Sequence, residues 1–333
     1  MKKILVLVLS CNLPNYDFKE DIIRNTWWQI AKEHENVSGC FFYKSALDGN
    51  RRIDYSKDIV YVPGSDYRDR SFQKMMKTIF YMEELGYEYD YILRLNISTY
   101  PNIKLMERYV QEITDETSFF TGSIIEQRYF SPQGLPFTQG EYMLMSKYNI
   151  NLLKLAYKAN MKMFDDMEKH PNNSGMIFLN DDGWVTKVLS DYYLTTSNMD
   201  MYLDKIHSLG ICHEPELALK KEHIYKNYPC VNYKIEFNKT DAINLRESDK
   251  YTKYDEYYQK KISKIHDVVT KSNWDVDEQI EILNKRLDTQ CYTWDIMRTG
   301  LFRVSDNSTV SKKYLAKKFM NEYKLSKTNK LYK

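Results

Sequence analysis

The sequence predicts an α/β fold in which a mostly parallel sheet is flanked by helices. The chain has 333 residues, of which 43% are hydrophobic, so it can bury a large core. Short apolar runs typical of buried strands alternate with segments whose apolar residues recur at helical spacing. Strands that alternate with helices run parallel in one sheet, which makes a doubly wound arrangement the expected architecture.

The first half of the chain supplies these elements in a regular order. The run Ile4–Leu9 contains only Ile, Leu and Val and ends at a polar residue, as a first buried parallel strand would. Pro63-Gly64 stops a later strand, because proline removes a ladder donor. The expected elements are a strand at Ile4–Leu9, a helix at 18–33, strands at 39–44 and 58–62, a helix at 71–85 and a strand at 89–95.

The second half continues the alternation and then becomes helical and strongly charged. We therefore expect a first domain over residues 1–250 and a C-terminal helical extension over residues 251–333. The expected elements are a helix at 103–113, strands at 119–126 and 141–146, and helices at 151–161, 184–192, 251–269, 276–287 and 311–324.

The charge distribution and the cysteines bear on the binding partners and the cellular compartment that the sequence favours. The net charge is +2, which argues against a simple electrostatic DNA binder, but residues 308–333 hold eight lysines and one glutamate. This basic tail is either a solvated helix end or a contact for phosphates or an anionic membrane surface. Five scattered cysteines without CxxC spacing predict a reduced, cytoplasmic protein. No segment approaches 18 consecutive apolar residues, so we expect no integral membrane association.

Polar residues follow two of the expected strands directly. Ser10, Cys11 and Asn12 end the first strand, and the triplet Asn96-Ile97-Ser98 ends the strand at 89–95. Ligands bind in the crevice outside the carboxyl ends of parallel strands. The sequence therefore predicts a binding site at this edge of the sheet.

Five segments, in order over roughly residues 1–240, resemble the β-1,3-galactosyltransferase-like enzymes. Residues 91–103 match that family's central strand and loop, with Asn96-Ile97-Ser98 in place of its Asp-x-Asp motif. The other matching segments are 21–27, 69–78 (through Asp69, Gln73, Lys77 and Thr78), 140–146 and 180–184. The resemblance implies a GT-A-like fold and an inverting transfer of one sugar from a nucleotide-sugar donor, preferably a UDP-sugar, to a glycan hydroxyl.

Asp181 and Asp182 are the best candidates for the base that such a transfer requires. An acceptor hydroxyl needs a carboxylate within hydrogen-bond reach. Adjacent aspartates before a helix also suit an N-cap, where they accept from free backbone N–H groups. One of the two can cap the helix while the other faces the acceptor. Glu141, just after Gly140, is a candidate for contacting the acceptor or the donor sugar.

The donor site is expected to lack a firmly held metal. Asn96 and Ser98 are poor ligands for Mn²⁺ or Mg²⁺ compared with carboxylates, and the family's late histidine falls near Asn232. Cationic side chains would then neutralise the diphosphate. The predicted donor-binding residues are Ser10, Cys11, Asn12, Arg24, Lys77, Arg94, Asn96, Ser98, Lys234 and Arg246.

Two other functions remain open at this point. The basic tail favours a phage-type enzyme that glycosylates a hydroxylated base in DNA, although residues 1–307 are acidic overall. Loss of the metal-binding motif favours a degenerate, non-catalytic nucleotide-binding protein. The sequence contains no Walker A, Gly-x-Gly-x-x-Gly or His-Glu-x-x-His motif, which removes the enzyme classes that depend on them.

Overall fold

The computed structural model describes residues 1–66, 70–122, 124–127, 135–138, 140–169, 181–196, 204–210, 229–232, 251–288, 292–294 and 302–304. Its centre is an eight-stranded sheet with the order β11-β7-β10-β5-β1-β2-β4-β3. The strands are β1 (Ile4–Leu9), β2 (Val37–Ala46), β3 (Arg52–Asp54), β4 (Ile59–Pro63), β5 (Tyr91–Asn96), β7 (Phe119–Thr121), β10 (Tyr142–Ser146) and β11 (Ile206–Ser208).

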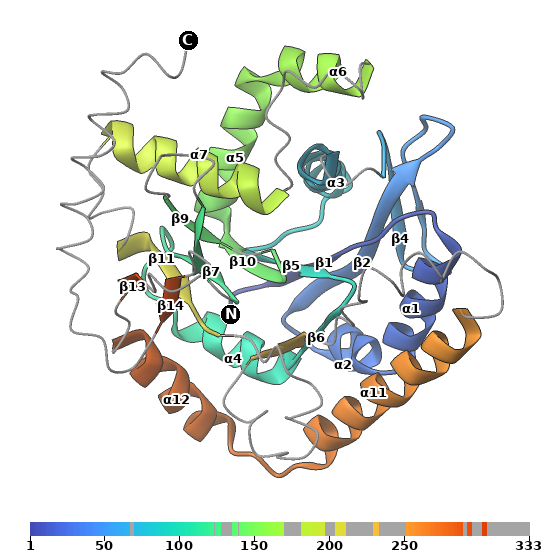
Figure 1. Cartoon of the computed structure of the whole chain (residues 1–333), viewed down its shortest axis with the longest axis vertical. Helices are drawn as coiled ribbons and strands as arrows, with labels where there is room; N and C mark the ends of the chain where they lie inside the picture. Colours follow the sequence, from blue (N-terminus) through green and yellow to red (C-terminus); the bar gives the residue numbers. More distant parts are fainter. Residues whose placement is uncertain are drawn as a thin grey trace.

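Helices cover both faces of this sheet (Figure 1). On one side lie α3 (Ser71–Glu84), α5 (Lys147–Ala159), α6 (Met161–Lys169) and α7 (Asp181–Thr196). On the other side lie α1 (Pro14–Arg24), α2 (Trp27–Glu33), α4 (Ile103–Glu112), α11 (Tyr251–Lys271) and α12 (Val276–Asp288). The predicted α/β fold, a mostly parallel sheet flanked by helices, is confirmed.

The alternation of side chains along β1 explains why both faces need covering. Val6 and Val8 belong to the buried cluster on the α1 side, and Leu5 and Leu7 to the cluster on the α3 side. Successive residues of a strand point to opposite faces, so an entirely apolar strand requires helices on both. Ile4–Leu9 therefore becomes a central strand.

One strand runs against the others in the middle of the sheet. β10 pairs antiparallel with both β5 and β7, whereas β1, β2, β4 and β5 form parallel pairs. The amino end of β10 therefore lies beside the carboxyl end of β5, with Tyr142 opposite Leu95. This arrangement brings Gly140 and Glu141, just before β10, next to the end of β5.

Several element boundaries differ from the expectation. The helix expected at 18–33 divides into α1 and α2, because the Thr26 hydroxyl donates to the carbonyls of Ile22 and Ile23 and so competes with a continuous helix. The strand expected at 119–126 divides into β7 and β8 (Ile124–Gln127), which belong to different sheets.

Several short strands are not predicted from the sequence, because they contain too few residues to show a periodic pattern. They comprise β3, β6 (Thr99–Pro101), β9 (Leu135–Thr138), β11, β12 (Cys230–Asn232), β13 (Tyr292–Trp294) and β14 (Phe302–Val304). Of these, β6 and β12 pair with each other just beyond β5 and matter for the site.

The two described helices of the C-terminal region join the main core. Ile262 and Ile265 of α11, with Ile280 and Leu283 of α12, belong to the same buried cluster as β1, β5 and α4. The helix expected at 311–324 lies outside the described residues. Within the described part of the chain, no helix combines the length and the apolar character needed to cross a membrane.

Candidate active site

A buried ion pair joins the central strand to the start of α7. Arg94, near the end of β5, is 1% exposed, and its Nη2 contacts Asp181 Oδ2. Its Nη1 donates to the Gly140 carbonyl, and its Nε donates to the Tyr43 hydroxyl at 3.3 Å. The guanidinium is thus fully engaged inside the protein, and its charge is offset by Asp181.

Asp181 is fixed from its other side by Ser71, the first residue of α3. The Ser71 hydroxyl donates to Asp181 Oδ1 at 3.1 Å and accepts from the Asp181 backbone N–H at 2.9 Å. Both carboxylate oxygens of Asp181 therefore have protein partners, and the residue is 4% exposed. Asp181 connects β5, α3 and α7 at one point.

Asp182 has a different environment from its neighbour. Its Oδ2 accepts from the Gly140 N–H at 3.1 Å, and its Oδ1 accepts from the Gly183 N–H at 2.8 Å. Burial and the nearby Asp181 carboxylate raise the pKa of Asp182 to about 7, although Arg94 acts in the opposite direction. Asp182 is only partly buried, so this carboxylate combines access to solvent with a near-neutral pKa.

Gly140 approaches Asp182 too closely for any side chain. A Cβ at residue 140 would lie 3.0 Å from Asp182 Oδ2 and 3.1 Å from its Cβ. Gly140 also accepts from Arg94 through its carbonyl. The backbone of this one residue consequently contacts both the ion pair and the carboxylate with the raised pKa.

The triplet Asn96-Ile97-Ser98 forms a turn beside these groups. Ile97 is buried, whereas Asn96 and Ser98 are partly exposed. The Asn96 backbone N–H donates to the Glu141 carbonyl at 3.0 Å, and the Thr99 hydroxyl donates to the same carbonyl at 2.9 Å. These two hydrogen bonds join the backbone of Glu141 to both ends of the turn.

Glu141 carries a buried polar atom, Oε2, that makes no hydrogen bond within the described part of the chain. A buried carboxylate oxygen without a donor is costly, and such an atom in a native protein calls for an explanation such as a bound group. Backbone contacts place Glu141 beside Asn96, and they place the preceding Gly140 beside Asp182. These three polar residues therefore lie near the junction of β5, β10 and α7.

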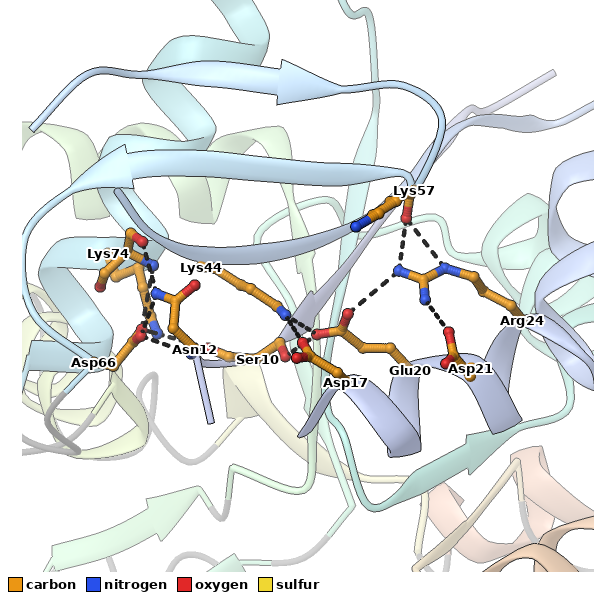
Figure 2. A network of polar contacts seen from close by, with 11 residues as sticks. Ser10, Asn12, Asp17, Glu20, Asp21, Arg24, Lys44, Lys57, Asp66 and Lys74 are labelled. Atoms are coloured by element: carbon orange, nitrogen blue, oxygen red, sulfur yellow. Dashed lines mark hydrogen bonds and ion pairs between the residues drawn. The ribbon is translucent and has the colours of Figure 1, made fainter. Parts of the chain in front are cut away.

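A second polar network occupies the carboxyl ends of β1, β2 and β4 (Figure 2). Asp66 accepts from the Asn12 backbone N–H at 2.9 Å and from Asn12 Nδ2 at 2.7 Å. Lys74 Nζ donates to Asp66 Oδ1 and to the Ser10 carbonyl, both at 2.7 Å. Asp66 and Lys74 thereby tie the loop after β4 and the helix α3 to the end of β1.

Burial affects the pKa of both members of the Asp66–Lys74 pair. It lowers the pKa of the Lys74 ammonium, although the nearby Asp66 carboxylate acts in the opposite direction. Burial alone would raise the pKa of Asp66, but Lys74 and the hydrogen bonds from Asn12 and Ser45 outweigh it, so that pKa is lowered. The two groups face each other at 2.7 Å as an ion pair.

The network continues from Ser10 towards α1. Glu20, which is 1% exposed, accepts from the Ser10 hydroxyl and pairs with Lys44 at 2.9 Å. Lys44 also pairs with Asp17 at 2.6 Å. Figure 2 shows Lys44 between Ser10 and the two carboxylates of α1.

The structure separates the predicted site residues into groups. One group lies around the end of β5 and comprises Asp181, Asp182, Arg94, Asn96, Ser98 and Glu141. A second group follows the neighbouring strand β1 and comprises Ser10, Cys11 and Asn12. Arg24 contacts Asp21, Glu20 and the Lys57 carbonyl, so its guanidinium is held on α1. Lys77 donates to the Pro63 carbonyl at 3.1 Å. Lys234 and Arg246 lie outside the described residues.

Asp66, Lys74 and Gly140 are the residues that sequence reasoning missed. Lys74 had a signal that could have revealed it, because Ser71, Lys74 and Thr78 form a polar row at helical spacing within the apolar face of α3. All three are buried, so polar groups at these positions require partners. Gly140 had no comparable signal, since its role depends on the packing of α7.

Asn96 and Ser98, at the position of the family's metal-binding motif, are weak ligands for a divalent metal because they offer neutral oxygens. The carboxylates of Asp181 and Asp66 are paired with cations. Within the described part of the chain, no three His, Cys, Asp or Glu side chains gather closely enough to hold a metal ion. We therefore derive no chemistry that depends on a metal.

Comparison with known proteins finds only distant structural similarity. No protein-family model matches the chain, and no curated protein matches it in sequence. Similar solved structures include a glycosyltransferase involved in glycosylation of the major capsid of PBCV-1, with 11% identity, a TM-score of 0.38, and coverage of 77% of this chain and 98% of that one.

Two further similar structures are those of the transferases GlyE and LgtC. GlyE of Streptococcus pneumoniae TIGR4 has 12% identity and a TM-score of 0.34, over 86% of this chain and 64% of GlyE. The galactosyltransferase LgtC, crystallised with donor and acceptor sugar analogues, has 8% identity and a TM-score of 0.37, over 78% of this chain and 95% of LgtC. All three proteins are glycosyltransferases, but these similarities are too low to carry an argument about activity.

Proposed function

We propose that this chain is a nucleotide-sugar-dependent glycosyltransferase that moves one sugar to an acceptor hydroxyl, with Asp182 as the base. The observation that carries the proposal is the partly exposed Asp182 carboxylate, whose pKa is raised to about 7 at the end of the central strand. A general base works best when its pKa lies near the working pH.

The proposed step is a single displacement. The acceptor hydroxyl gives its proton to an oxygen of Asp182 while its own oxygen bonds to the anomeric carbon of the donor sugar. The bond from that carbon to the diphosphate breaks, and the electron pair leaves with the nucleoside diphosphate. Attack from the face opposite the leaving group inverts the configuration of the anomeric carbon.

Of the two aspartates, Asp181 would fix the start of α7 and Asp182 would act as the base. Asp181 is held by Arg94 and Ser71, which suits it to fix the start of α7. Asp182 accepts only backbone N–H groups, so each of its oxygens keeps a lone pair for a substrate proton. We accordingly assign the base role to Asp182 alone.

Asn96 and Glu141 are proposed to bind substrate hydroxyls beside the base. The unpartnered Glu141 Oε2 is suited to accept from a sugar hydroxyl, and the Asn96 amide can both donate and accept. Ser98, at the other end of the same turn, offers a further hydroxyl. Together these groups supply the dense, mixed hydrogen bonding that a sugar requires.

The donor nucleotide is proposed to lie over the carboxyl end of β1, near Ser10, Cys11 and Asn12. A UDP-sugar remains the preferred donor on the family resemblance described above. Of the cations proposed to neutralise the diphosphate, Lys77, Lys234 and Arg246 remain candidates. Arg94 is already paired with Asp181, which supports an indirect role for it.

The decisive experiment is a transfer and hydrolysis assay with a panel of nucleotide sugars. The wild-type chain should release nucleoside diphosphate from at least one of them. Asp182→Asn should reduce that release about 10²- to 10⁴-fold, the usual contribution of a general base. Turnover that persists in Asp182→Asn would show that the base is wrongly assigned, and no turnover with any donor would favour the non-catalytic alternative.

Metal dependence is tested in the same assay. Activity should survive an excess of chelator, since the described donors do not suit a divalent ion. Complete loss that Mn²⁺ restores would contradict this expectation. The acceptor is best sought first among glycans, with duplex DNA carrying hydroxylated bases as the comparison.

A further inference from the structure

The helix α11 contacts the strand that follows the Asn96-Ile97-Ser98 turn. Tyr100 of β6 is 1% exposed, and its hydroxyl forms a hydrogen bond of 2.8 Å with His266 Nδ1 of α11. The two rings are 6.1 Å apart between centroids. These residues are 166 positions apart in the sequence, so α11 reaches the vicinity of the site only through the fold.

β6 has only a short ladder to hold it in place. It contains three residues, and within the described part of the chain it pairs only with β12, another three-residue strand, in an antiparallel ladder. A two-stranded ribbon of this length is not stable by itself. The position of β6 therefore depends on side-chain contacts, and the buried Tyr100 hydroxyl supplies one.

The contacts of β6 lead directly to the groups proposed to act on substrate. Thr99, beside Tyr100, donates to the Glu141 carbonyl, which also accepts from the Asn96 N–H. Glu141 follows Gly140, whose N–H donates to Asp182. A continuous series of bonds thus runs from α11 to the proposed base.

Apolar packing acts at the same place. Ile97, at the centre of the turn, belongs to the buried cluster that also contains Tyr100 and the α11 residues Ile262 and Ile265. The apolar residues of α11 and of the turn therefore belong to one continuous core.

We propose that Tyr100 and His266 are positioning residues through which α11 holds the Asn96-Ile97-Ser98 turn and Glu141 in place for substrate. The part concerning substrate rests on the proposed glycosyl transfer, whereas the part concerning the turn does not. α11 belongs to the active-site framework in this view.

Burial makes the contact compatible with neutral pH. It lowers the pKa of His266, with the neighbouring Lys271 acting in the same direction and Asp267 in the opposite one. The imidazole is therefore neutral at pH 7, and a neutral ring can exchange a hydrogen bond with the Tyr100 hydroxyl.

The first test is hydrogen–deuterium exchange of peptides covering residues 94–102, which needs no enzymatic activity. Tyr100→Phe and His266→Leu each remove one partner, so exchange at these amides should accelerate about threefold to tenfold, the equivalent of one net hydrogen bond. His266→Asn, which keeps a polar group near the Nδ1 position, should restore most of the protection.

Two control variants separate this effect from general loosening. Tyr109→Phe removes a hydroxyl from a buried tyrosine of the same apolar cluster, and Ser263→Ala changes an exposed residue of α11. Both should leave exchange in residues 94–102 unchanged. Peptides of β2 should exchange at the wild-type rate in every variant.

The second test uses the transferase assay once a donor is known. Tyr100→Phe and His266→Leu should raise the donor KM about threefold to tenfold with a smaller change in kcat, because they disturb positioning but leave Asp182 in place. Unchanged exchange at residues 94–102 in both variants would overturn the proposal. Accelerated exchange without any transferase activity would support the role of α11 and reject only the proposed function.

Discussion

The backbone N–H of Gly140 and the Oδ2 of Asp182 lie 3.1 Å apart, and no side chain could be added at residue 140 without displacing that oxygen. This contact joins the segment before β10 to the first turn of α7. It explains why a glycine stands where a residue with a Cβ would meet the proposed base.

Gly140→Ala should therefore reduce transfer more than it reduces stability. The added methyl would lie 3.0 to 3.2 Å from Asp182, so Asp182 must shift by a few tenths of an ångström. Because a displacement of about 1 Å of a reacting group costs on the order of 10²-fold in rate, we expect a loss of transfer of roughly threefold to tenfold. The measurement is kcat/KM together with the thermal midpoint. Gly49→Ala is the control, because φ at Gly49 is +74° and open space surrounds it. That control should lower stability through backbone strain and leave activity near wild type.

Breaking the Arg94–Asp181 pair should destabilise the fold strongly. Either Arg94→Met or Asp181→Asn leaves one buried group without its partner, at a cost of about 3–5 kcal/mol. The double variant should lose clearly less than the sum of the two single losses, because it leaves no unpaired charge. Chemical denaturation measures the free energies of unfolding. Additive losses would show that the two residues do not depend on one another.

The raised pKa of Asp182 predicts two opposite responses to pH. Transfer should increase as the pH rises through about 7, since the base must lose its proton to act. Stability should fall over part of the same range, because the folded state holds this proton more tightly than the unfolded state does. The contribution is present below about pH 4 and is lost as the pH rises to about 7.

Asp182→Asn provides the matching comparison. An amide does not titrate, but its NH₂ group cannot accept one of the two backbone hydrogen bonds that Asp182 accepts. The stability of this variant relative to wild type should therefore rise by about 1–4 kcal/mol between pH 4 and pH 7. Denaturant unfolding at the two pH values measures the difference. A stability gap that stays constant between pH 4 and 7 would show that Asp182 titrates normally.

Lys74 and Lys77 offer a direct comparison on one helix. Lys74→Met removes the ammonium that pairs with Asp66 and donates to the Ser10 carbonyl, so it should cost about 2–4 kcal/mol. Lys77→Met alters a partly exposed lysine and should cost much less. Equal losses in denaturant unfolding would mean that the Lys74 network contributes little.

Most strands and helices around the sheet could be predicted from the sequence, because their apolar side chains recur at strand or helix spacing. β1, β4 and β5 are apolar enough to be recognised singly, and the apolar face of α3 is continuous. The direction of β10 was not readable. A buried strand has the same pattern whether it runs parallel or antiparallel, so its orientation depends on how the chain returns to the sheet.

The sequence allowed residues to be proposed for the site, but it could not distinguish their surroundings. Asp181 and Asp182 are adjacent and alike in sequence, and only the packing of Arg94 and Ser71 distinguishes them. Arg94 was expected to face a diphosphate, yet its charge is offset by Asp181. Arg94 and Asp181 lie far apart in the sequence, so their pairing has no local signature. Asp66 and Lys74 are only eight positions apart, but one lies in a loop and the other on a helix, so no periodic pattern links them.

The antiparallel direction of β10 bears on the order in which the sheet can assemble during folding. β1, β2, β4 and β5 come from the first 96 residues and are joined by short crossovers, so they can assemble as a unit. β7 and β11 join this unit only through β10, which must first dock against β5. Glu141 and Gly140 arrive with that strand, so we expect the proposed catalytic cluster to form only once β10 has docked against β5.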